Sequence, residues 1–83
     1  MIKVNIQIKT NADAVHMVKA AMQMPCDVDF SNGRRITDAK SLLGVLSSDF
    51  SKPCVLSIND ERNTEHVKEF LNAIKDILIS VED

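Results

Sequence analysis

Hydrophobic and polar residues alternate along the first residues of the chain. Apolar side chains occupy every second position from Ile2 to Ile8, with lysine, asparagine and glutamine between them. A period of two is typical of a strand that buries one face and exposes the other to solvent. The pattern therefore predicts that the chain opens with a strand.

The period then changes to that of a helix. Thr10 or Asn11 can cap its start, and Asp13 suits the positive end of the helix dipole in the first turn. Pro25 cannot lie inside the helix, which should end near Gln23. The side that faces the core is predicted to be the stripe of Ala14, Met17, Val18 and Ala21.

A hairpin and a short helix are predicted next. Two strands, 26–30 and 34–37, flank a Ser-Asn-Gly turn, and Asn-Gly favours the positive φ angles of tight turns. Thr37 or Asp38 is expected to start a short helix that runs through Leu46. Its apolar face is formed by Leu42, Val45 and Leu46.

The last third of the chain predicts one strand and one long helix. Residues 54–58 follow a proline and are mostly apolar, as in a buried strand. From Asn63 or Thr64 a helix is expected to run to about Ser80. Its apolar stripe consists of Val67, Phe70, Leu71, Ile74, Ile77 and Leu78.

The predicted order βαββαβα indicates an α+β fold, an open-faced β-sandwich. Three helices with apolar stripes need a common surface, which a four-stranded antiparallel sheet covered on one face provides. Residues 1–83 are expected to form a single domain of this kind. If the fourth strand lies antiparallel beside the second, Cys26 and Cys54 start at opposite ends and are too far apart for a disulfide.

Composition narrows the choice of function. Ten basic against twelve acidic residues give a net charge of −2, which argues against a general nucleic-acid binder. The first residues lack the pattern of a signal peptide and no apolar run is long enough to span a membrane, so we expect a cytoplasmic protein that binds no membrane. The two cysteines are far apart and have neither zinc-site nor redox spacing, so they are interpreted as inert thiols.

The segment NGRRITDAKSLLGVLS, residues 32–47, resembles a characteristic segment of HPr, the histidine-containing phosphocarrier family of the bacterial sugar phosphotransferase system. The chain has one extra residue before Lys40. The predicted order of elements and the chain length are also similar to those of the family. The resemblance implies an HPr-like fold and a role in sugar transport or its regulation.

HPr proteins carry their phosphate on a histidine just ahead of the first helix, in a Gly-(Ile/Leu)-His-Ala-Arg-Pro-Ala motif. Aligning the apolar stripes of the first helices puts Thr10 at the place of that histidine, Ala12 at the arginine and Asp13 at the proline. A second alignment matches His16 instead, but it shortens the helix to about two turns. The helical register favours the first alignment, and by it the family's active-site motif is degenerate.

The chemistry of phosphate transfer agrees with this choice. Backbone amides and a positive partial charge at a helix N-terminus can hold phosphate oxygens, whereas His16 is expected in the middle of the helix on its outward side. Asp13 would repel phosphate at the helix start. His16 is therefore interpreted as an exposed surface residue, with the alternative that it has taken over as phospho-acceptor.

Two other features of the family have counterparts here. Ser41 falls on the serine that a dedicated kinase phosphorylates in some bacteria, although it can also serve only as a helix cap. Leu42, Leu43 and Leu46 are expected to be partly exposed and to form an apolar docking patch like the one by which HPr proteins meet their partners.

These observations lead to two hypotheses. The first is a non-enzymatic regulatory or interaction protein that phosphorylation of Ser41 would switch. The second is an active phosphocarrier that uses His16. The resemblance implies protein partners such as enzyme I, HPr kinase or a transcription regulator. We expect a monomer without a cofactor. We also expect no bound metal, because His16, His66 and the cysteines have no ligand spacing.

Overall fold

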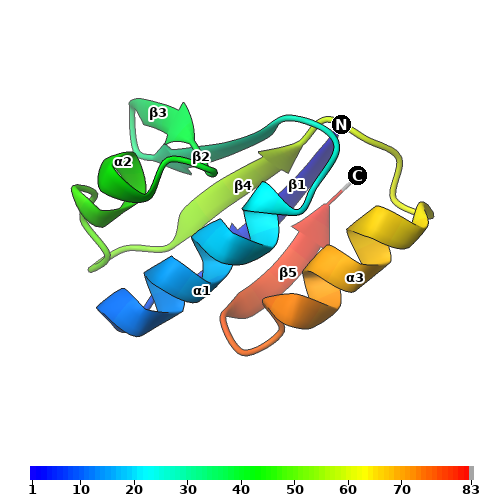
Figure 1. Cartoon of the computed structure of the whole chain (residues 1–83). Coiled ribbons are helices and arrows are strands. Elements are labelled where there is room, and N and C mark those ends of the chain that lie inside the picture. Colours follow the sequence, from blue (N-terminus) through cyan, green and yellow to red (C-terminus); the bar gives the residue numbers. More distant parts are fainter. Residues whose placement is uncertain (83) are drawn as a thin grey trace.

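The computed structural model describes residues 1–82, which form one antiparallel sheet and three helices (Figure 1). The elements, in chain order, are β1 (Ile2–Ile6), α1 (Asn11–Met22), β2 (Val28–Asn32), β3 (Arg35–Asp38), α2 (Leu42–Leu46), β4 (Cys54–Ile58), α3 (Glu65–Ala73) and β5 (Leu78–Glu82). The fold is an open α+β sheet, as predicted from the sequence.

The sheet has the strand order β3-β2-β4-β1-β5, with every neighbouring pair antiparallel. The prediction that β4 lies antiparallel beside β2 is confirmed, with Phe30 opposite Leu56. The predicted number of strands is wrong: residues 1–82 form five strands, not four, in the order of elements βαββαβαβ. The additional strand is β5, at the free edge beside β1.

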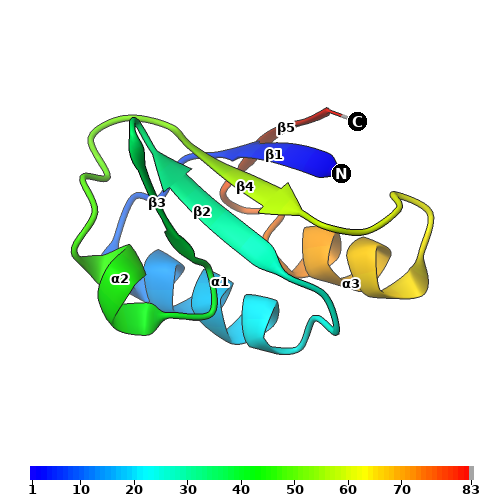
Figure 2. The ribbon, with the colours of Figure 1, turned by 90° about the horizontal axis from the view of Figure 1, so that it is seen from above.

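All three helices lie on one face of the sheet, as the view from above shows (Figure 2). Alternate side chains of β1, β2 and β4 point to this face and are buried, including Val4, Phe30 and Leu56. The predicted stripe of α1 packs against them: Ala14, Met17, Val18 and Ala21 are all buried. These residues belong to one hydrophobic core.

The prediction of one long C-terminal helix reaching Ser80 is wrong for its second half. The helix α3 ends at Ala73, and after a turn Gln7 N donates to Ile77 O at 2.8 Å. This contact brings the chain alongside β1, where Val81 pairs with Val4. The register slips between Asn5 and Ile6, where the chain accommodates one extra residue of β5.

The apolar pattern of this segment predicted burial better than it predicted the backbone. Val67, Phe70, Ile74 and Ile77 are buried, whereas Leu71 and Leu78 are partly buried and pack against the core. An apolar position every three or four residues fits a helix up to Ile74, and the following residues continue the same pattern by coincidence. Pairing with β1 decides their conformation.

The hairpin and the short helix are shifted relative to the prediction. The strands begin at Val28 and Arg35, and Gly33 has a φ of 63°, as the predicted turn requires. Asn32, the other residue expected in the turn, is instead the last residue of β2 and has no positive φ. Neither Thr37 nor Asp38 starts the helix, because β3 continues through both. The carboxylate of Asp38 instead accepts a hydrogen bond from Lys40 N at 2.9 Å, which makes a turn before the helix.

Both cysteines are free thiols. No helix among residues 1–82 has the length and apolar character needed to cross a bilayer.

Candidate functional site

The N-terminus of α1 is closed by a pair of reciprocal hydrogen bonds. Asp13 N donates to Thr10 Oγ1 at 3.1 Å, and the Asp13 carboxylate accepts from Thr10 N at 3.2 Å. The same carboxylate oxygen accepts from Lys9 N at 3.2 Å. This capping box satisfies backbone amides at the helix start and places a negative charge there. Thr10, not an imidazole, stands at the leading end of the helix.

His16 lies in the middle of α1 on its exposed side, and its ring reaches the other helix. His16 Nε2 is 2.8 Å from Ala73 O, the carbonyl of the last residue of α3. A carbonyl can only accept, so Nε2 carries the proton of this hydrogen bond. The imidazole therefore caps the C-terminus of α3, where carbonyl groups lack helical partners. The sequence placed His16 on the outward side but gave no sign of this contact.

A small hollow of about 180 Å³ surrounds the imidazole of His16. Two carboxylates line it, those of Asp13 and Asp76, together with Ala73, Ile74 and Ile77. Like charges repel, so these carboxylates disfavour a bound anion beside the ring. The surroundings of His16 are thus poorly suited to phosphate.

The short helix α2 is fixed at both ends. At its start Gly44 N donates to Ser41 Oγ at 3.4 Å, and the preceding Lys40 Nζ donates to Met24 O at 2.9 Å. At its end the Arg35 guanidinium donates to Ser47 O at 3.1 Å and to Ser47 Oγ at 2.6 Å. Five residues are too few for a helix to be stable alone, so these contacts are what hold α2 in place.

Gly44 allows α2 to lie close against β3. A Cβ atom at this position would clash with Thr37 Oγ1, whereas Gly44 makes the approach without conflict. One turn of the helix is then anchored by Val45, which is fully buried. Lys40, Ser41, Gly44 and Val45 thus each have a structural role in seating α2.

The opposite side of α2 carries three leucines that the core does not use. Leu43 is 82% exposed, Leu42 40% and Leu46 36%. We refer to these three residues as the leucine patch. Ser41 is also exposed, at the N-terminal end of the patch.

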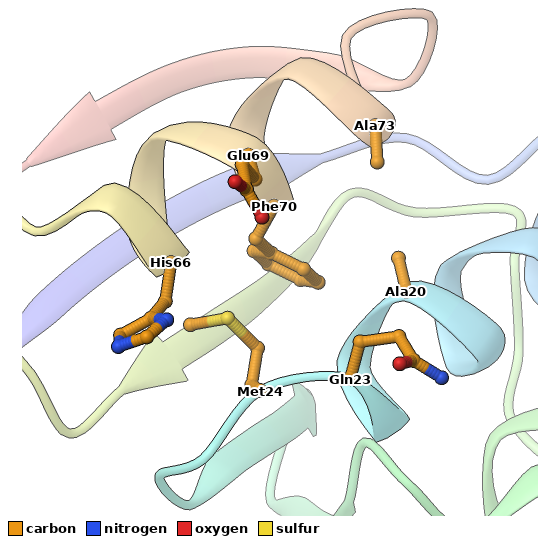
Figure 3. Close-up of a pocket in the computed structure, with 7 residues that line it drawn as sticks. All are labelled: Ala20, Gln23, Met24, His66, Glu69, Phe70 and Ala73. Carbon is orange, nitrogen blue, oxygen red and sulfur yellow. The ribbon is translucent and has the colours of Figure 1, made fainter.

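A second groove, of about 200 Å³, lies between α1 and α3 (Figure 3). Phe70 and Met24 point into it, and the ring of His66 lies beside the Met24 side chain. Ala20 and Ala73 leave room between the helices, and Gln23 and Glu69 line the groove with them. Sequence reasoning assigned His66 to the surface, which is correct, but did not detect the groove, because its residues are distant in the sequence.

Both thiols have a raised pKa. Burial raises the pKa of Cys54, against the opposing effect of the hydrogen bond from Asn32 Nδ2 to Cys54 Sγ at 3.1 Å. Burial, then the charge of Asp60, raises the pKa of Cys26. A thiol with a raised pKa contains less of the nucleophilic thiolate at neutral pH. Within residues 1–82, no three His, Cys, Asp or Glu side chains are grouped closely enough to hold a metal ion.

Comparisons with known protein families, with curated proteins and with solved structures give no match to this chain.

Proposed function

We propose that this chain is a non-enzymatic, cytoplasmic relative of HPr that binds protein partners through the leucine patch and does not carry phosphate on histidine. The partners are those of the sugar phosphotransferase system or of carbon regulation, such as enzyme I, HPr kinase or a transcription regulator. The proposal rests on the resemblance of residues 32–47 to the family and on the geometry of α1 and α2.

The observation that carries the docking role is the exposure of Leu43 on a helix that is hydrogen-bonded at both ends. Arg35, Lys40 and Ser41 fix the two ends of α2, so its leucines are presented in one arrangement. Exposed leucines contribute little to folding, and a cluster of them on an anchored element is typical of a binding surface. A preformed surface also lowers the entropy cost of association.

The start of α1 supports the loss of phosphate transfer. The place that the family uses for its histidine holds Thr10, and the backbone amides of Lys9 and Thr10 are already bonded to the Asp13 carboxylate. Incoming phosphate would have to displace that carboxylate and overcome its charge. His16 Nε2 is occupied by Ala73 O, and two carboxylates line the hollow around the ring.

Incubation with phosphoenolpyruvate, enzyme I and Mg²⁺ tests this part of the proposal. We expect no acid-labile phosphate on the protein, while a working HPr in the same mixture is labelled. Labelling that disappears in His16→Ala would instead establish the alternative function, a phosphocarrier that uses His16. That alternative draws on one observation, the exposure of the imidazole on α1.

Docking is tested by titrating enzyme I into the isotope-labelled protein and following amide resonances. Leu42, Leu43 and Leu46 should shift, and Leu43→Ala should weaken binding about tenfold, as expected for a residue near the centre of an interface. Ile36→Ala is the matched control, because Ile36 is also highly exposed, at 67%, but belongs to β3. Equal effects of both variants would contradict a role of the leucine patch.

Ser41 is the proposed switch. Its hydroxyl is exposed and caps α2, so a phosphate there would remain at the helix start and add a charge beside the leucine patch. HPr kinase and ATP should label the wild-type protein but not Ser41→Ala. Labelling at another residue, or none, would remove the switch and leave Ser41 as a cap.

A further inference from the structure

Two hollows follow one another along the boundary between α1 and α3. The first is the groove of Figure 3, the second is the hollow around His16, and Ala73 lines both. We refer to them together as the α1–α3 groove. The hydrogen bond from His16 Nε2 to Ala73 O joins the two helices at this boundary. The groove is therefore formed before any ligand binds, which lowers the entropy cost of binding.

The two hollows differ in chemistry. Phe70 and Met24 point into the first hollow and give it an apolar floor, and the Glu69 carboxylate lies at its side. The carboxylates of Asp13 and Asp76 line the second hollow. No lysine or arginine is among the described residues that line either hollow. With neutral histidines the lining carries negative charge only, so it attracts a cation beside an apolar group.

The size of the hollows favours side chains of a protein over a small molecule. Their volumes are about 200 and 180 Å³, whereas pockets for small molecules usually have about 300 to 1,000 Å³. Asp13 in the second hollow and Ala20 in the first are seven residues apart on α1, which is about 10 Å at the usual helical rise. A ligand must therefore present its apolar group and its cation at about this separation.

We propose that the α1–α3 groove is a second docking site, which binds a basic amphipathic segment of a partner protein. A large apolar side chain of that segment fills the first hollow over Phe70. A lysine or arginine one to two helical turns away lies beside the carboxylates of Asp13 and Asp76. The two backbone amides that bond to Asp13 both use Oδ2, and a carboxylate has further positions at which it accepts hydrogen bonds.

This site is separate from the leucine patch. The helix α2 lies on one side of α1 and α3 lies on the other, as the view from above shows (Figure 2). Segments that pack an apolar face into a preformed groove are a common mode of peptide recognition. The two surfaces differ in charge as well, because the first turn of α2 contains no acidic residue. The chain thus presents two docking surfaces for partners of different chemistry.

Selection of peptides tests the class of ligand. A phage-displayed library of random peptides is selected on the wild-type protein, and peptides that also bind Ala73→Leu are removed. Ala73 is exposed and leucine favours helices, so this variant should fold while its longer side chain fills the groove. The leucine patch is intact in both proteins, so peptides that it holds are discarded and the result does not depend on the proposed function.

The selected peptides should combine a large apolar residue with a lysine or arginine one to two helical turns away. The proposal is overturned if no peptide distinguishes the wild-type protein from Ala73→Leu. It is also overturned if the peptides that do so are acidic or lack a basic residue.

Removing charges tests the role of the carboxylates. Glu69→Gln together with Asp76→Asn keeps the shape of the groove and should weaken binding of the selected peptides about tenfold, as expected for the loss of two charge pairs. The control is Asp29→Asn together with Glu82→Gln, which removes equal charge from exposed positions of the sheet. Equal weakening by both pairs of substitutions would show that net charge, not the groove, attracts the peptides, and would overturn the proposal.

Sedimentation equilibrium of the protein alone tests whether a second copy of the chain is the occupant instead. The wild-type protein should have the mass of the monomer, 9.2 kDa. A dimer that Ala73→Leu dissociates would assign the groove to a second copy and overturn the proposal.

Discussion

The helices α1 and α2 both begin with a side-chain N-cap, but they differ in which polar groups remain exposed beside that cap. A hydroxyl caps each helix, that of Thr10 in α1 and that of Ser41 in α2. In α1 the Asp13 carboxylate closes the turn from the other side, whereas the first turn of α2 contains no acidic residue. The start of α1 is thus occupied, and α2 keeps an exposed hydroxyl beside exposed leucines.

The difference shows that a surface for docking and a site for phosphate chemistry depend on separate parts of the chain. On the proposed function, three substituted positions at the start of α1 replace the site where the family holds its phosphate. The leucine patch depends on different residues, those that anchor α2 to β3 and to the end of α1. On the proposed function, one feature has been retained and the other lost.

The largest expected effect is a gain of function at α1. Thr10→His, Ala12→Arg and Asp13→Pro together restore the family's histidine, arginine and proline. The triple variant should acquire acid-labile phosphate from enzyme I and phosphoenolpyruvate, which the wild-type protein should not. The control is Thr10→His alone, which retains the Asp13 carboxylate and should be labelled far less. A folded triple variant that remains unlabelled would contradict the alignment that places Thr10 at the histidine.

The next largest effect is a loss of stability where α2 packs closely against β3. Gly44→Ala sets a methyl group against Thr37 Oγ1 and should lower the free energy of unfolding by about 2 kcal/mol, in the range of overpacked sites. Urea unfolding measures the loss. Thr37→Ala removes the conflicting hydroxyl, so the double variant should recover most of the stability. Without that recovery, the close approach of α2 and β3 would not explain the glycine.

Removing the cap of α1 should cost less. Thr10→Ala should lower the free energy of unfolding by about 1 kcal/mol, the usual value for an N-cap. Thermal unfolding should then occur about 4–8 °C lower in a domain of this size. Asp13→Ala should couple to it, since each residue bonds to the backbone of the other. Additive losses would indicate that the two hydrogen bonds act independently.

The smallest effect is expected at the leucine patch itself. Leu43→Ala should change the free energy of unfolding by less than about 0.5 kcal/mol, because the side chain is almost fully exposed. Val45→Ala, two residues further along and fully buried, is the comparison and should cost several times more. Calorimetry measures the loss of stability in each variant. A large loss in Leu43→Ala would mean that the patch supports the fold.

Most of the fold could be predicted because local patterns and buried faces agreed. The stripe of α1 and the strand from Cys54 to Ile58 were predicted correctly, and Thr10 was one of the two caps that the sequence offered for α1. In these segments the spacing of apolar residues, the capping residue and the flanking proline all favour the same element. The hairpin turn at Gly33 was correct as well, although its strands were displaced by one or two residues.

The candidate site also has some features that the sequence predicted and others that only the structure shows. The outward position of His16 follows from helical periodicity and is confirmed. The same periodicity placed Leu42 and Leu46 on the apolar face with Val45, but only Val45 is buried, and the exposure of the leucines was expected from the family resemblance instead. The hydrogen bond from His16 to Ala73 and the groove between α1 and α3 were not expected. Each joins residues about fifty positions apart, and no local pattern contains that information.

The sequence by itself determined most of the buried apolar surface, and it placed the starts of α1 and α3 to within one residue. The tertiary structure alone decided that the chain after Ala73 leaves the helix and becomes β5, which pairs with β1. The reason is physical: Ile77 can be buried from a helix or from an extended segment, so its hydrophobicity does not choose between them. The unpaired side of β1 does, because a strand placed there satisfies backbone groups that a longer α3 would have left open.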